Sequence, residues 1–361
     1  MLELINESAW AAGLYPGWDA QRCFQMTLVV KAGYRFELDG ALSPLPDLEL
    51  IEADSHYGKP LETSLEFASE IAPFKQGSEI YLRGTAYPPK AGAVVAEVSM
   101  ALHFADRGRW QKRLRVFGVR EWKRRVVGRV PTSPMPLEPV PLRYEYAFGG
   151  RHEDSGDEYD ANPVGMGFNR GQWRVDDERL PQIELGPPYL TSPSQRRPPG
   201  GFGPLPVFWS PRVEAMGEAG QDGAADEADS SEDTCPYARD MRADAYNAAP
   251  SDQRFDQPFA GGEVLQLRGF FTDQAQGVEL VLPADRPTPL LHAGTEQRLE
   301  PVFDTVIVDT DAREIHVLYR VGIPWQFRTS RRGYVIVPAM EDLSSGRDND
   351  TSTLSQAGVS R

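Results

Sequence analysis

The sequence has 361 residues and is 40% hydrophobic, which is enough to bury a sizeable core and excludes a globally disordered chain. Its formal net charge of −15 argues against nucleic acid or an anionic membrane surface as the main partner, because both attract Lys and Arg. The only cysteines, Cys23 and Cys235, are far apart, which excludes a disulfide framework and a cysteine-based zinc site.

The first third of the chain carries alternating patterns that predict β-strands. Residues 26–38 are rich in β-branched and aromatic side chains and end at the turn signal Asp39-Gly40. Residues 113–120 alternate basic and apolar side chains, which is typical of a strand with one wet and one dry face. An antiparallel meander is the simplest arrangement for residues 20–130. Two more strands are predicted at residues 79–87 and 93–104.

The middle of the chain, residues 131–212, has a different composition. Prolines, glycines and aromatic residues are dense there, so we expect this segment to wrap over the sheets with its aromatic side chains as anchors. Residues 214–233 contain eight acidic residues and no Lys or Arg, which predicts a flexible, solvated insertion over residues 213–240. An alternative role for this insertion is to attract a basic partner.

Strand patterns return after the acidic insertion. Residues 302–308 and 314–321 flank a polar turn that begins at Asp309, which predicts a β-hairpin. The tail at residues 341–361 is polar and rich in Ser and Asp, so we expect it to be disordered. Two further strands are predicted at residues 263–271 and 277–283.

These patterns predict a mainly β protein, built as an antiparallel β-sandwich or as barrel-like lobes with long loops and few short helices. Residues 79–87 resemble residues 263–271, so the two β regions are either related lobes or similar by chance. The predicted organisation is an N-terminal β lobe at 1–130, a connecting segment packed on the sheets at 131–212, the acidic insertion at 213–240, a C-terminal β lobe at 241–340 and the tail at 341–361.

No pattern in the sequence indicates an active site. The five histidines lack the spacing of a helical zinc site or a metal-binding strand, and no Gly-x-Ser-x-Gly nucleophile turn is present. Asp309 and Asp311 form an acidic pair, but a hairpin turn favours Asp there for hydrogen bonds to its own backbone. The glycine-rich segments lack the strand and helix that frame a phosphate-binding loop. We therefore predict a protein that is not an enzyme and binds no cofactor or metal.

Two motifs of the central segment resemble a known family. Residues 141–150 (PLRYEYAFGG) and 162–168 (NPVGMGF) are similar to motifs of the type VI secretion effector-adaptor family, first catalogued only as a domain of unknown function. The resemblance spans most of residues 20–325. It departs from the family's pattern after Pro211-Arg212, where the acidic insertion replaces a compact segment. Other similar segments are residues 30–40, 180–184, 201–204 with Trp209 and 211–212, 249–253, 262–263 and 303–305.

The resemblance implies a cytoplasmic, non-catalytic adaptor or chaperone. Such proteins are thought to hold a toxic effector, often through a PAAR-type region, and to help load it onto the VgrG spike. The start of the chain agrees with this location, because Met1 to Leu4 show neither the basic nor the long apolar region of a secretory signal. No apolar run is long enough to cross a bilayer, so no membrane insertion is expected.

The same motifs supply the candidate partner-binding residues. Aromatic side chains often anchor interfaces because they bury a large area with few rotatable bonds. Motifs that contain Gly, Pro and Asn more often fix a backbone, and this structural role is the favoured alternative. Two other functions are kept: a β-sandwich carbohydrate-binding module or hydrolase, with two carboxylates beside Trp209 or Trp173, and a structural component of the secretion apparatus. The candidates are Tyr144, Tyr146, Phe148, Asn162, Phe168, Trp209 and Arg212.

Overall fold

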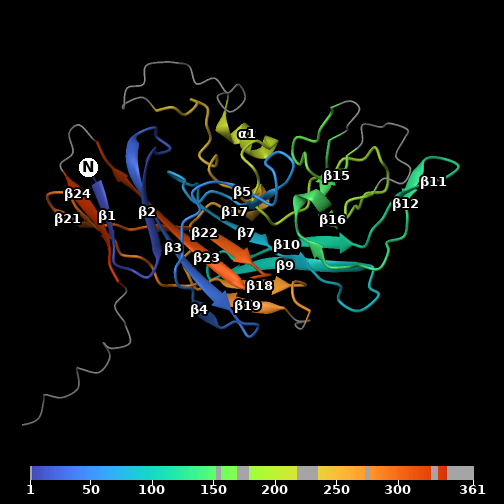
Figure 1. The fold of residues 1–361 in the computed structure, drawn as a ribbon, viewed down its shortest axis with the longest axis horizontal. Helices are drawn as coiled ribbons and strands as arrows, with labels where there is room; N and C mark the ends of the chain where they lie inside the picture. The colour runs from blue at the N-terminus through green and yellow to red at the C-terminus, as the bar shows by residue number, and fades with distance from the viewer. Residues whose placement is uncertain are drawn as a thin grey trace, which may run out of the picture.

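The computed structural model describes residues 2–151, 156–168, 179–217, 235–272, 277–326 and 332–339, which form a mainly β protein (Figure 1). The described part contains one α-helix, α1 (Ser210–Met216), and two short 3-10 helices, η1 (Tyr144–Tyr146) and η2 (Ser251–Gln253). Several antiparallel sheets are present, and none of those in the described part closes into a barrel. The predicted fold class is confirmed. No helix in these ranges is both long and apolar enough to span a membrane.

The largest sheet has seven strands and combines the two ends of the chain. Only β7 and β22 run parallel in it; the other pairs are antiparallel. The predicted hairpin is confirmed as β22 and β23, and Asp309 Oδ1 accepts hydrogen bonds from the N–H groups of Asp311 (3.0 Å) and Ala312 (2.9 Å). The spatial order is β17 (Arg254–Phe255), β7 (Ser78–Arg83), β22 (Val302–Asp309), β23 (Glu314–Pro324), β3 (Phe24–Phe36) and β2 (Ala11–Trp18), with β4 (Leu42–Pro44) paired to β3.

The second sheet has five antiparallel strands. Leu114 and Val116 on β10 are fully buried while Arg113 is exposed, so the predicted wet and dry faces are confirmed over residues 113–116. The alternation does not hold to residue 120, because β10 ends at Phe117 and Arg120 is buried in an ion pair with Glu184. The single meander expected over residues 20–130 is wrong, because β3 and β7 take hydrogen-bond partners from the C-terminal third. Consecutive strands in this range pair only as separate two-strand units, such as β9 with β10 and β3 with β4. The spatial order is β16 (Ile183–Glu184), β10 (Gly108–Phe117), β9 (Val95–Phe104), β18 (Val264–Arg268) and β19 (Val278–Val281).

Smaller sheets surround these two. A four-stranded sheet has β1 (Leu2–Asn6) and β24 (Gly333–Val337) side by side in parallel, followed by β20 (Leu290–His292) and β21 (Glu296–Arg298). The remaining strands form two-stranded sheets: β5 (Ser55–His56) with β6 (Leu65–Phe67), β8 (Thr85–Ala86) with β13 (Val140–Pro141), β11 (Trp122–Arg124) with β12 (Arg129–Pro131), and β14 (Phe148–Gly149) with β15 (Met166–Gly167).

The two large sheets share one hydrophobic core and therefore form a β-sandwich. Leu28 and Val306 of the seven-stranded sheet belong to the same buried cluster as Met100 and Leu265 of the five-stranded sheet. Both large sheets contain strands from the ranges 1–130 and 241–340, so neither large sheet belongs to one predicted β lobe alone.

The range boundaries themselves stay a prediction. A duplication of the two similar segments also stays a prediction. Their strands have different surroundings: β7 lies in the seven-stranded sheet beside the parallel strand β22, whereas β18 lies in the five-stranded sheet between two antiparallel strands. Residues 213–216 of the predicted insertion are helical in α1, while residues 218–234 and the predicted tail at 341–361 lie outside the described residues.

Candidate partner-binding region

The two family-like motifs fold against each other. The first forms η1 and β14, and the second ends in β15, which pairs with β14 in parallel. Two glycines make this approach possible. A Cβ on Gly149 would lie 2.1 Å from the carbonyl oxygen of Asn162, and Gly150 has a φ of +115°, which side-chain-bearing residues rarely adopt. The glycines of the first motif are therefore required by the backbone.

Asn162 connects the two motifs from inside the protein. Its side chain is fully buried, and its Nδ2 donates hydrogen bonds to the carbonyl oxygens of Tyr144 (2.9 Å) and Phe148 (3.1 Å). The N–H of Gly150 donates in return to the carbonyl oxygen of Asn162 at 2.8 Å. Because buried carbonyl groups need donors, this one amide side chain fixes the conformation of the whole first motif.

Tyr144, Trp209 and Arg212 form the other side of the cluster. The Tyr144 and Trp209 rings meet edge to face with centroids 5.2 Å apart, and the Tyr144 hydroxyl donates to the carbonyl oxygen of Gly203 at 3.1 Å. Arg212 lies in α1, and its guanidinium donates to the carbonyl oxygens of Leu205 (3.0 Å) and Ala245 (3.4 Å). Burial raises the pKa of Tyr144 and lowers the pKa of Arg212. These side chains hold chain segments together.

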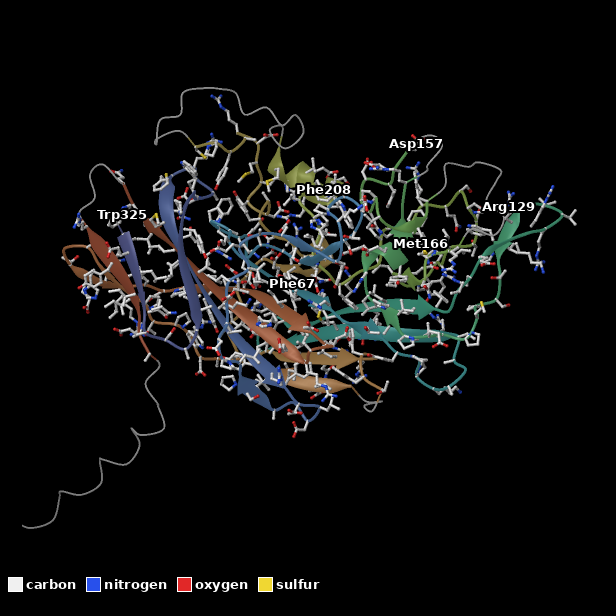
Figure 2. All side chains as sticks on the ribbon, viewed as in Figure 1. Phe67, Arg129, Asp157, Met166, Phe208 and Trp325 are labelled. Carbon is white, nitrogen blue, oxygen red and sulfur yellow. The ribbon has the colours of Figure 1, made fainter. Side chains whose placement is uncertain are left out.

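The seven candidate residues thus lie in one region, but most are inaccessible to a partner in this structure. Tyr144, Phe148, Asn162, Trp209 and Arg212 are buried. Only Tyr146 and Phe168 are half-exposed, and Phe168 contacts the ring of Tyr159 at 5.6 Å between centroids. Because Trp209 is fully buried, it offers no stacking platform for a sugar, and Trp173 lies outside the described residues. In Figure 2, Met166, on β15, lies above β9 and β10 in the view, and Arg129 lies near the right-hand edge.

A surface cavity opens next to this region. It has a volume of about 130 Å³ and lies between Phe148, the end of β16 and the segment 185–198. Glu184 is the acidic residue in its lining, but its carboxylate is bound by Arg120 at 2.6 Å and by the N–H of Leu190 at 2.8 Å. The accessible lining is therefore mainly apolar, with Arg197 beside it. Its other lining residues are Pro181, Ile183, Leu185, Gly186, Pro187, Leu190 and Pro198.

The cavity's size limits what it can hold. Pockets for small-molecule ligands usually have about 300–1,000 Å³, so this cavity suits one apolar side chain of a larger partner. The sequence pointed to residues 180–184 only as part of the family resemblance. It gave no sign of Leu190 or Arg197, because the cavity forms where a proline-rich turn returns to β14. The proline pair Pro187-Pro188 was the available signal of that turn.

A second hollow lies on the outer face of the seven-stranded sheet. It has about 300 Å³ and is lined by Lys31, Glu70 and His316, among others. Lys31 Nζ lies 2.7 Å from Glu70 Oε1 and 3.1 Å from the carbonyl oxygen of Glu49, while Glu70 Oε2 accepts the N–H of Ile51 at 2.8 Å. These charges fasten the segment 49–70 to the sheet.

His316 completes that hollow. Burial, together with the charge of Lys31, lowers the pKa of His316 to about 4, so its ring is neutral at pH 7. Among the described residues, no three His, Cys, Asp or Glu side chains are grouped so that they could hold a metal ion.

Comparison with known proteins gives one result. A sequence model of the family described as "Uncharacterized protein conserved in bacteria (DUF2169)" matches residues 21–320. This range includes the five-stranded sheet, the motif cluster and the seven-stranded sheet except β2 and the end of β23. No curated protein and no solved structure gives a match to the chain. Since the family match covers most of the sequence, the chain belongs to this family of bacterial proteins, DUF2169.

Proposed function

We propose that this protein is a non-catalytic adaptor that holds a type VI secretion effector in the cytoplasm and helps to load it onto the VgrG/PAAR spike. The resemblance of its central motifs to the effector-adaptor family supports this role. So does the structural role of the buried candidate residues Asn162 and Arg212, whose side chains hold chain segments together by hydrogen bonds.

The observation that carries the proposal is the cavity next to Phe148. Its volume of about 130 Å³ and its mainly apolar lining suit an inserted side chain of a protein. Its lining includes Phe148 of the first motif and three residues of the family-like segment 180–184, so residues that carry the family resemblance contribute to this surface. Tight interfaces commonly place an apolar or aromatic anchor in such a pocket, surrounded by a polar rim.

Affinity capture of the tagged full chain from its own bacterium, with mass spectrometry of the bound proteins, tests this function. We expect an effector linked to a VgrG or PAAR protein to be recovered. A strain that lacks the gene should lose effector export or effector abundance. Normal effector abundance and normal export in that strain contradict the proposal.

A cavity-blocking variant tests the role of the surface. Pro198→Trp places a large side chain at the exposed rim of the cavity, and we expect it to lower effector recovery at least tenfold, about 1.4 kcal/mol of binding free energy. Val281→Trp on β19 is the matched control, since Val281 is exposed at a distant sheet edge and its replacement should leave recovery unchanged. Equal recovery with both variants would remove the cavity from the interface.

A further inference from the structure

A short β-hairpin projects from the edge of the molecule. It consists of β11 and β12, residues 122–131, and we name it the basic arm. Figure 1 shows these two strands beyond the ends of β9 and β10, on the side opposite β1 and β24. Between Trp122 and Pro131 the arm has Lys123, Arg124, Arg125 and Arg129 and no acidic residue.

The base of the arm is firmly attached. Trp122 is 2% exposed and packs in one buried cluster with Phe148, Leu180 and Leu190. The N–H of Thr132 donates to the carbonyl oxygen of Glu121 at 2.8 Å, and the N–H of Glu121 donates to Thr132 Oγ1 at 3.0 Å. Because Phe148 and Leu190 also line the cavity, the arm begins beside the surface proposed to receive a partner side chain.

The turn at the tip of the arm has an unusual sequence. The N–H of Arg125 donates to the carbonyl oxygen of Gly128 at 3.0 Å, which places Val126 and Val127 at the two central positions. Gly, Asn, Asp and Ser normally fill such positions because they suit the turn and are solvated. The two valines are instead 105% and 89% exposed, and a Cβ added to Gly128 would meet no atom within 4 Å. The fold does not need two apolar side chains in this place.

The charge of the arm is also unlike that of the rest of the protein. The whole chain has 38 Lys and Arg against 53 Asp and Glu residues, whereas residues 122–131 contain four Lys and Arg and no Asp or Glu. Lys123, Arg124 and Arg125 are exposed, and they have no ion-pair partner in the described part of the chain. A basic extension on an acidic protein orients the approach of a partner whose contact surface is acidic.

We propose that the basic arm is a docking element that inserts Val126 and Val127 into an apolar pocket of the held protein, with Asp and Glu side chains around that pocket. This inference rests on the proposed function and specifies the chemistry of the partner surface. The valines supply apolar area that the partner removes from water, and the basic side chains supply association rate and orientation. A duplex nucleic acid or an anionic membrane is disfavoured, because the remainder of the chain is strongly acidic.

Two arm variants separate these contributions, with the effector recovered in the capture experiment as the probe. Arg124→Glu with Arg125→Glu should lower the association rate constant roughly tenfold near physiological salt, with a smaller effect at high salt. Val126→Ser with Val127→Ser should mainly raise the dissociation rate constant, also roughly tenfold. Arg109→Glu with Arg113→Glu reverses two exposed charges on β10 and should change neither constant more than about twofold. Wild-type binding by both arm variants overturns the inference and leaves the adaptor function standing.

A photo-crosslinking amino acid at position 127 of the full chain, used in the living bacterium, tests the inference without a known partner. The expected result is a crosslink to a protein whose attached peptide has apolar residues flanked by Asp or Glu, and its loss with the Arg124→Glu, Arg125→Glu background. Crosslinks only to nucleic acid, to lipid, to a second copy of this chain or to nothing overturn it. If wild-type capture recovers no effector while this acidic crosslink forms, the adaptor function fails and the arm's docking chemistry stands.

Discussion

Two regions of this protein use charged side chains in opposite ways. On the outer face of the seven-stranded sheet, three ion pairs are buried: Lys31 with Glu70, Lys75 with Glu79, and Arg320 with Asp304. In the basic arm, Lys123, Arg124 and Arg125 are exposed to water beside two exposed valines. A buried charge must be matched within the fold, whereas an exposed charge without a partner is available to another molecule. The charges of the sheet face therefore fix structure, whereas the exposed charges of the arm are suited to the binding role proposed for it.

Breaking a buried pair should have the largest effect on stability. Glu79 is fully buried, and its carboxylate accepts hydrogen bonds from Lys75 Nζ and, at 3.0 Å, from the N–H of Ala249. Burial alone would raise the pKa of Glu79, but the Lys75 charge and these donors lower it, so the group is ionised. Glu79→Ala leaves Lys75 buried without its partner and should cost about 3–5 kcal/mol of unfolding free energy, measured by urea denaturation.

Two variants make that measurement specific. Glu314→Ala breaks the pair with Arg35, whose side chain is 57% exposed, and should cost less than about 1 kcal/mol. Lys75→Met combined with Glu79→Leu removes both buried charges and should recover much of the loss. A Glu79→Ala protein no less stable than Glu314→Ala would mean that the buried pairs do not hold this face together.

The lowered pKa of His316 should make the unfolding free energy depend on pH. Its folded pKa of about 4 lies below the unfolded value of about 6.5, so the unfolded chain binds a proton that the folded chain does not. The stabilising contribution is complete above pH 6.5 and is lost as the pH falls toward 4, by up to about 3 kcal/mol. His316→Gln should flatten this part of the stability profile. An unchanged slope between pH 6.5 and 4 in that variant would assign the loss to other groups.

Variants of Asn162 test the hydrogen bonds of the motif cluster, with a smaller expected loss of unfolding free energy. Asn162→Ala removes the donors to the carbonyl oxygens of Tyr144 and Phe148 and should cost about 2 kcal/mol. Asn162→Asp keeps the size of the side chain but places carboxylate oxygens against the carbonyl oxygens of Tyr144 and Phe148, which are also acceptors. This variant should therefore be less stable than Asn162→Ala near pH 7. Thermal unfolding of the two variants side by side gives the comparison. The reverse order would show that size, and not hydrogen bonding, is what the site requires.

The sequence allowed the strands to be predicted but not their neighbours. Alternation along residues 113–120 is a local property of one strand, and the turn at Asp309 is encoded by the turn residues themselves. The parallel pairing of β7 with β22 joins segments more than 200 residues apart, and no local pattern encodes it. The interleaving of N- and C-terminal strands in both sheets follows from such pairings, which is why the two β ranges looked like separate lobes.

The candidate site shows the same division. Gly149, Gly150 and Asn162 could be expected to fix a backbone, because their types serve tight approaches and amide hydrogen bonds. Burial of Trp209 and Arg212 could not be read from the motif, since it depends on α1 packing over the segment. The basic arm was overlooked because alternation near β10 explained the neighbouring arginines as a wet strand face. The signal was present in Val126-Val127-Gly128, a turn without polar residues.

The smallest effect on stability is expected in the arm. It provides the clearest contrast with the buried ion pairs of the sheet face. Val126→Ser with Val127→Ser changes two side chains that are as exposed in the folded protein as in the unfolded chain, so the unfolding free energy should shift by no more than about 0.5 kcal/mol. Urea denaturation under the conditions used for Glu79→Ala provides the direct contrast. A loss above about 1 kcal/mol would show that the arm packs on the body in solution, and its valines would then be part of the fold. An unchanged midpoint together with faster release of the partner would assign these side chains to binding alone.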